Sequence, residues 1–252
     1  MIIFPMAGLS KRFKNAGYEL PKYMLEAGGE TLFHHSVMSF KNYFSSERFV
    51  FVALDRYNTQ LFIKRECKAM GLMNYEIVIL EKPTNGQAET VYLAIEKLNI
   101  GSDESLLIFN IDTFRPSFSW PKEFDLSDID GYLETFIGSG ANWSNVLPKD
   151  TLRQTVHLTA EKQQISEYCC TGIYFWRRSG DYWRIYQNHF DQIVNKAPNG
   201  EFYIAPMYND LIQEGKTVHY SIVANDDVIF CGVPHEYEEF CRVNADRSEY
   251  KL

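Results

Sequence analysis

The sequence predicts an α/β fold with a doubly wound, mostly parallel sheet. In the first half of the chain, segments that are apolar throughout alternate with segments that carry apolar residues at helical spacing. The apolar segments lack the alternation of a strand with one wet face, so we expect helices to cover both of their faces. A loop rich in small and basic residues follows the first apolar segment, where open α/β sheets bind ligands.

The first half is expected to contain four strands joined by three helices. Val91, Ala94 and Leu98 illustrate the helical interval. The strands are predicted at Met1–Met6, Phe49–Leu54, Glu76–Leu80 and Leu106–Asn110, and the helices at Thr31–Phe44, Asn58–Met70 and Gln87–Leu98.

The second half is less regular and predicts a mixed extension of the sheet that covers the ligand cleft. Residues that favour turns separate its first two strands: Gly138, Gly140, Asn142, Pro148 and Lys149. Strands are predicted at Gly131–Phe136, Thr171–Trp176 and Thr217–Val223, and helices at Asp181–Val194 and Glu201–Gln213.

Composition excludes several classes of protein. Of the 252 residues, 45% are hydrophobic and 23% charged, which indicates a folded chain with a substantial core. The net charge of −8 argues against a general affinity for nucleic acid. No apolar run is long enough for a membrane span, and basic residues follow the short apolar start, the reverse of a secretory signal, so we expect a cytoplasmic protein.

The cysteines predict neither a disulfide framework nor a zinc site. Their number is odd and no C-x-x-C pair occurs, so packing roles are expected. They are Cys67, Cys169, Cys170, Cys231 and Cys241.

The loop after the first predicted strand carries the strongest functional signal. Its small residues allow backbone N–H groups to approach phosphate oxygens, and its basic residues add local positive charge to an acidic chain. The residues concerned are Ala7, Gly8, Ser10, Lys11, Arg12 and Lys22. A tight turn with solvated basic side chains is the alternative, but the combination favours a phosphate site.

The segment Ala7-Gly8-Leu9-Ser10-Lys11-Arg12-Phe13, followed by Pro21-Lys22, resembles the signature of the sugar-phosphate nucleotidyltransferases. The spacing is most similar to the phosphocholine cytidylyltransferases and to capsule cytidylyltransferases that act on phosphorylated amino acids, such as phosphoglutamine. Further segments resemble family motifs in the same order, and the likeness extends to about Phe240. These segments are Asn85–Ala88, Leu106–Asp112, Glu161-Lys162, Thr171–Tyr174 and Cys231–Tyr237.

The resemblance implies a Rossmann-like, GT-A-like nucleotidyltransferase fold that forms one domain over residues 1–252. Residues 1–115 would form the nucleotide-binding half and residues 116–252 the acceptor-binding half. The implied reaction joins a nucleotide from a triphosphate, with CTP favoured, to a small phosphorylated acceptor and releases pyrophosphate. A sugar phosphate, phosphocholine and a phosphorylated amino acid are the acceptors considered. A role in bacterial capsule or surface polysaccharide synthesis is expected, and a homodimer is left open.

The resemblance also assigns residues to roles. Arg12 and Lys22 are the catalytic cations: Arg12 would hold the β and γ phosphates, and Lys22 would bridge the α-phosphate and the acceptor phosphate. Asp112 would bind Mg²⁺ as the cofactor. The nucleotide-binding set is Ala7, Gly8, Leu9, Ser10, Lys11, Gly86 and Gln87, and the acceptor-binding set is Glu161, Lys162, Trp143 and Thr171.

The chain departs from the family pattern at the second metal ligand. Relatives carry an aspartate where this chain has Phe230, and Asp226 and Asp227 lie nearby but out of register. Leu9 and Lys11 also stand where some sugar enzymes have glycine. The sequence therefore defines neither a second metal ligand nor a specific sugar.

Several alternatives stay open at this point. Asp112 could cap a loop, Lys162 could be a solvated surface lysine, and Gln87 could merely begin a helix. His34 and His35 fit a helix pattern and are expected to be structural. Trp143 could anchor the covering extension instead of stacking on an acceptor.

Two other functions are considered. A glycosyltransferase that consumes a nucleotide sugar would carry an Asp-x-Asp pair, but Thr113 and Phe114 follow Asp112. A non-catalytic nucleotide-binding module is the other alternative. A Rossmann dehydrogenase is disfavoured because no Gly-x-Gly-x-x-Gly follows the first strand.

Overall fold

Four parallel strands form the first part of the central sheet in the computed structural model, which describes residues 1–193 and 201–248. They are β1 (Ile2–Pro5), β4 (Phe49–Leu54), β5 (Tyr75–Leu80) and β6 (Leu106–Phe109). Their order is β5-β4-β1-β6, with Ile3 opposite Val50 on one side and Ile108 on the other. These strands match the predicted segments closely.

The same sheet continues into five strands of mixed direction. They are β11 (Tyr168–Trp176), β8 (Gly131–Ile137), β12 (Val218–Val223), β10 (Thr155–Glu161) and β9 (Ser144–Asp150), in that order after β6. Only the β8–β12 pair is parallel, and β9 also pairs with β11. The first half therefore has the predicted parallel sheet, and the second half has the mixed extension that was predicted for it.

Strands β9 and β10 occupy a segment for which turns were predicted. The two strands form an antiparallel pair joined by a short connection, which favours antiparallel pairing. Pro148 lies in β9 opposite Val156, where the register shifts on both sides. Proline is tolerated in a strand at such an irregularity because the ladder hydrogen bond is already interrupted there.

The helices of the first half follow the prediction except for the short helix over Lys11–Asn15, which was expected to be part of a loop, and those of the second half depart from it further. They are α1 (Lys11–Asn15), α2 (Leu32–Met38), α3 (Thr59–Met70), α4 (Gln87–Leu98), α5 (Ser179–Ile193), α6 (Tyr208–Gln213) and α7 (Pro234–Ser248). Helix α2 ends before the predicted Phe44, and a short 3₁₀ helix, η2 (Lys41–Tyr43), follows it. Helix α7 was not predicted from the sequence, and the expected end of α5 at Val194 lies outside the described residues.

The predicted helix over Glu201–Gln213 was wrong at its start. Residues 201–203 are not helical, and the short 3₁₀ helix η4 (Ala205–Met207) precedes α6. The reason is a tertiary contact: the Phe202 N–H donates to the Asn85 carbonyl at 2.5 Å, and the Phe202 carbonyl accepts from the Ala88 N–H at 3.2 Å. These bonds hold the segment extended against the start of α4.

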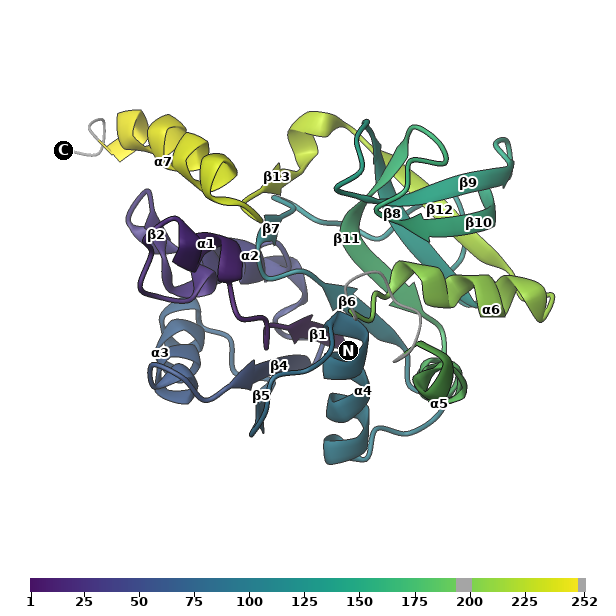
Figure 1. Ribbon diagram of the computed structural model, residues 1–252, viewed down its shortest axis with the longest axis horizontal. Coiled ribbons are helices and arrows are strands. Elements are labelled where there is room, and N and C mark those ends of the chain that lie inside the picture. Colours follow the sequence, from purple (N-terminus) through teal and green to yellow (C-terminus); the bar gives the residue numbers. More distant parts are fainter. Residues whose placement is uncertain (194–200, 249–252) are drawn as a thin grey trace.

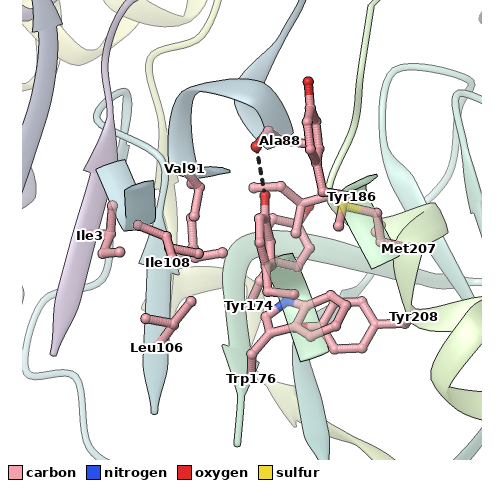
Figure 2. Close-up of a cluster of buried hydrophobic side chains, with 14 of the residues drawn as sticks. Ile3, Ala88, Val91, Leu106, Ile108, Tyr174, Trp176, Tyr186, Met207 and Tyr208 are labelled. Atoms are coloured by element: carbon pink, nitrogen blue, oxygen red, sulfur yellow. Dashed lines mark hydrogen bonds between the residues drawn. The ribbon is translucent and has the colours of Figure 1, made fainter. Parts of the chain in front are cut away.

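Two apolar layers cover the two faces of the sheet (Figure 1). On one face, α4, α5 and α6 pack on residues such as Ile3 and Ile108, and Figure 2 shows Ala88 and Val91 of α4 in this cluster with Trp176 and Tyr208. On the other face, α2 and α3 pack on Ile2, Phe4 and their neighbours. The Tyr182 hydroxyl donates to the Ala88 carbonyl at 3.0 Å, so the core fixes the first turn of α4.

A small two-stranded ribbon brings the late part of the chain to the sheet. Strand β13 (Ile229–Phe230) pairs with β7 (Thr113–Phe114), so that Phe230 lies opposite Thr113. The Cys231 N–H then donates to the Asp112 carbonyl at 2.8 Å. The beginning of α7 therefore lies beside the end of β6.

A buried ion pair connects the ribbon to the mixed half of the sheet. Arg115 donates to both carboxylate oxygens of Glu134 in β8, at 2.7 and 3.1 Å. Arg115 also donates to the Asp227 carbonyl at 2.8 Å. Burial raises the pKa of Glu134, and the Arg115 guanidinium opposes that shift.

Within the described ranges, no helix is both long and apolar enough to cross a bilayer. The five cysteines are free thiols, and all but Cys241 are buried.

Candidate active site

A cleft of about 730 Å³ opens at the carboxyl ends of β1 and β6. Every site residue predicted from the sequence lines this cleft, although they come from segments far apart in the chain. These residues are Ala7, Gly8, Leu9, Ser10, Lys11, Arg12, Lys22, Gly86, Gln87, Asp112, Trp143, Glu161, Lys162 and Thr171. What each of them binds stays a prediction.

The loop after β1 and the start of α1 bring basic residues to the cleft. Ser10 adopts a left-handed conformation with φ of 51°, which turns the chain from the strand into α1. Phe13 is buried and anchors α1, whereas Arg12 on the same helix is exposed at the cleft. The Ser10 hydroxyl accepts a hydrogen bond from the Lys22 N–H at 3.3 Å, which places Lys22 next to the loop.

Lys22 and Asp112 form an ion pair that lines the cleft. The Lys22 ammonium donates to Oδ2 of Asp112, and both side chains are largely shielded from solvent. Gly232 lies against this pair, because a Cβ atom placed there would be 3.2 Å from Asp112 Oδ2 and 3.6 Å from Glu236 Oε2. Two carboxylates, Asp112 and Glu236, therefore flank Gly232 at the cleft.

The carboxylates suit a Mg²⁺ ion that binds together with phosphate oxygens. Glu236 Oε2 accepts from the N–H groups of Gly232 and Val233 at 2.8 and 3.2 Å, so it caps the start of α7. Asp226 and Asp227 do not line the cleft. No cluster of three metal-ligating side chains occurs in the described part of the chain. Mg²⁺ commonly uses one or two carboxylates plus substrate phosphates, which this set provides.

Asp112→Asn should raise the Mg²⁺ concentration needed for half-maximal activity by about tenfold or more, since even residues behind a metal ligand contribute that much to affinity. The amide keeps the shape of the side chain but loses its charge. Titration of Mg²⁺ against turnover measures the effect. Asp103→Asn is the matched control, because it makes the same substitution in an exposed ion pair with Arg178 outside the cleft and should leave the titration unchanged. An unchanged titration for Asp112→Asn would contradict metal binding.

The start of α4 forms one wall of the cleft. The Gln87 amide donates to Asn110 Oδ1 at 2.8 Å, which leaves its carbonyl oxygen as an acceptor. Gly86 has a φ of 138°, and a Cβ atom there would lie 2.3 Å from the Phe202 carbonyl oxygen. The glycine at this position is therefore required by packing against Phe202, whatever the loop binds.

The opposite wall of the cleft combines aromatic and polar side chains. Trp143 packs on Phe230 with ring centroids 4.4 Å apart and on Phe136 at 5.2 Å. Glu161 accepts a hydrogen bond from the hydroxyl of Ser144, which follows Trp143 in the chain, and burial raises the pKa of Glu161. Phe230, the residue at the position of the missing aspartate, thus helps to hold Trp143 at the cleft.

Lys162 is held in a defined place on this wall. Its backbone is left-handed, with φ of 53°, and its N–H donates to the Trp143 carbonyl at 3.0 Å. The ammonium donates to the Tyr203 hydroxyl and lies 3.7 Å from Glu201 Oε2. Lys162 is therefore not a freely solvated lysine.

Thr171 differs from the other predicted acceptor residues. Its side chain is almost completely buried, and its hydroxyl donates to Glu134 Oε1 at 2.9 Å. The Thr171 hydroxyl therefore donates its proton to Glu134, which is also the partner of Arg115. Thr171 lines the cleft, but its polar group supports the sheet.

Sequence reasoning gave no role to several residues that line the cleft. Asn110, Glu201, Tyr203 and Glu236 contribute polar groups there. Glu236 lies within the segment Cys231–Tyr237, which resembles a family motif. Its position at the start of a helix could have identified it as a capping residue at the cleft. Glu201 and Tyr203 carried no such signal, because their place depends on the contact of Phe202 with the start of α4. His34 and His35 do not line the cleft.

Comparison with solved structures identifies close similarity to one group of enzymes. A nucleoside-diphosphate-sugar pyrophosphorylase from Vibrio cholerae RC9 shares 46% sequence identity with this chain, and the two structures superpose with a TM-score of 0.90. The match covers 96% of this chain and 100% of the other. An inositol-1-phosphate CTP transferase from T. maritima is 15% identical with a TM-score of 0.70, over 100% of this chain and 96% of the other. A UDP-glucose pyrophosphorylase in its apo form is 13% identical with a TM-score of 0.70, over 100% and 98%. No protein-family model and no curated protein matches the chain.

Proposed function

The chain belongs to the nucleoside-diphosphate-sugar pyrophosphorylase family of nucleotidyltransferases, and from this premise we propose that it transfers a nucleotide from CTP to a small sugar phosphate. The observation that carries the proposal is the convergence of Arg12, Lys22 and Lys162 on one cleft. A nucleotidyl transfer brings two phosphorylated substrates together, and three cations in one cleft can neutralise the phosphates of both.

The proposed reaction needs no protein nucleophile. An oxygen of the acceptor phosphate forms a bond to the α-phosphorus, and the bond from that phosphorus to the α,β-bridging oxygen breaks. The electron pair of the broken bond leaves with pyrophosphate. Catalysis therefore depends on in-line positioning and on neutralising charge.

The side chains of the cleft suit these two tasks. The Arg12 guanidinium can bind the β and γ phosphates with two parallel hydrogen bonds and stabilise the departing pyrophosphate. Lys22 is paired with Asp112, and its ammonium can pass from that carboxylate to the α-phosphate and the acceptor phosphate. Mg²⁺ bound at Asp112 would supply further neutralisation of the triphosphate oxygens.

The acceptor wall supports a sugar phosphate. Lys162 offers one ammonium for the phosphate, Trp143 offers a flat apolar surface, and Glu161 offers a hydrogen-bond acceptor for a hydroxyl. The preference for CTP rests on the resemblance of the loop Ala7–Phe13 to cytidylyltransferases. A role in surface polysaccharide synthesis is part of the same proposal.

Pyrophosphate release tests the proposal directly. We expect the protein to release pyrophosphate with CTP and at least one sugar 1-phosphate, and to do so more slowly with UTP, dTTP or GTP. Phosphocholine and phosphorylated amino acids complete the panel of acceptors. Release of a nucleoside diphosphate from a nucleotide sugar, without pyrophosphate from any triphosphate, would instead identify a glycosyltransferase.

A further inference from the structure

Tyr203 lines the cleft beside Lys162, and nothing in the sequence marked it. It belongs to the extended segment that precedes η4, and its side chain is half-buried at the cleft. We propose that Tyr203 is a positioning residue, which holds the Lys162 ammonium where the acceptor phosphate binds; the proposal rests on the proposed function.

The contacts of the Tyr203 side chain support this role. The Lys162 ammonium donates to the Tyr203 hydroxyl, and that hydroxyl donates in turn to Glu201 Oε2. The ammonium also lies 4.3 Å from the centre of the Tyr203 ring, within the range of a cation–π interaction. One residue therefore restrains Lys162 through both its ring and its hydroxyl.

Lys162 requires such a restraint. A lysine ends in a compact charge on a flexible stem, so fixing the ammonium costs conformational entropy. The left-handed backbone of Lys162 sets where the stem begins, but only contacts at the far end can set where the charge lies. A charge held in place before the acceptor binds loses less freedom on binding.

The backbone next to Tyr203 connects it to the nucleotide side. Phe202 is buried, and its main chain bonds to Asn85 and Ala88 on either side of Gly86. The segment Phe202-Tyr203 therefore contacts both the loop that precedes Gln87 and the side chain of Lys162. Tyr203 is anchored through its neighbour to α4, which packs in the core (Figure 2).

The hydroxyl of Tyr203 remains a neutral donor and acceptor at working pH. Burial raises its pKa, and the hydrogen bond to Glu201 and the charge of Glu201 raise it further. Arg12 acts in the opposite direction, which also places Arg12 in the electrostatic neighbourhood of Tyr203.

Steady-state kinetics of Tyr203→Phe, Lys162→Ala and the double variant tests the proposal. Tyr203→Phe keeps the ring and removes only the hydroxyl, so the KM for the acceptor should rise about fivefold, the size expected for one ordinary intramolecular hydrogen bond. The KM for the triphosphate should change less than twofold. Lys162→Ala should raise the acceptor KM more, and the double variant should match Lys162→Ala, because Tyr203 acts through the lysine.

Tyr18→Phe is the matched control. The Tyr18 hydroxyl donates to Glu238 Oε1 at 3.1 Å, so the variant also removes a phenol–glutamate hydrogen bond, but outside the cleft. Its kinetic constants should equal those of the wild type. Equal rises in both KM values for Tyr203→Phe would indicate a structural role and overturn the proposal. Additive effects in the double variant would also overturn it, because Tyr203 would then contact the acceptor itself.

Calorimetric titration of inorganic phosphate separates this proposal from the proposed function. Binding needs no turnover, so it can be measured even if no pyrophosphate is released in the wild type. Phosphate affinity should fall about fivefold in Tyr203→Phe and no further in the double variant than in Lys162→Ala. Unchanged phosphate affinity in Tyr203→Phe would overturn the role of Tyr203, whereas an inactive wild type would overturn only the nucleotidyl transfer.

Discussion

Arg12→Ala should lower turnover about a hundredfold or more, the loss typical when one preorganised donor to developing charge is removed. Arg12 is exposed on α1 at the basic end of the cleft, and the loop that carries it follows β1. Charge accumulates on the pyrophosphate as it departs, so a guanidinium there acts most strongly in the transition state. The variant should therefore lose kcat and kcat/KM together.

The chain offers a matched control on the same helix. Lys14 is also exposed and basic, but it does not line the cleft. Lys14→Ala should keep wild-type turnover, and both variants should keep the wild-type melting temperature because neither side chain is buried. Arg12→Lys should fall between wild type and Arg12→Ala, since lysine keeps the charge but not the two-pronged fork. Turnover of Arg12→Ala within twofold of wild type would refute the assignment.

The sequence predicted most elements of the first half of the fold, because there the local hydrophobic pattern agrees with the observed burial of the side chains. Strand β4 is buried along its whole length, so its apolar run was unambiguous. Helix α4 has a buried stripe at helical spacing, and its predicted and observed bounds coincide. The end of a parallel strand is also where ligand loops occur, which placed Asp112 and the loop after β1 at one edge of the sheet.

The second half depended on contacts between distant residues. Strands β9 and β10 carry polar residues and Pro148, so no local pattern revealed them, and their pairing with β11 and β12 stabilises them. The helical spacing over Glu201–Gln213 was misleading because Phe202 bonds to the start of α4. Side chains placed by such contacts, Tyr203 above all, could not be found from spacing alone.

Arg115→Met should destabilise the protein by about 3–5 kcal/mol, the cost of leaving one partner of a buried ion pair uncompensated. The side chains of Arg115 and Glu134 are 8% and 3% exposed, so water cannot replace the lost guanidinium. Besides Glu134, the Asp227 carbonyl would lose its donor. Chemical denaturation at pH 7 measures the difference. Arg153→Ala is the surface control: its ion pair with Asp150 is exposed and should contribute less than about 1 kcal/mol.

The pH dependence and a second substitution identify the cause of that loss. Burial already raises the pKa of Glu134, and removing Arg115 removes an opposing charge, so the folded-state pKa should rise further above the unfolded value. When the folded-state pKa of a carboxyl group is raised, the folded protein loses stability as the pH rises through that pKa. The deficit of Arg115→Met should therefore be smaller at pH 5 than at pH 8. Arg115→Met/Glu134→Gln should recover much of the stability, because no buried charge remains. A deficit that is independent of pH and unchanged in the double variant would mean that lost packing, and not the unpaired Glu134 charge, destabilises the sheet beneath the cleft.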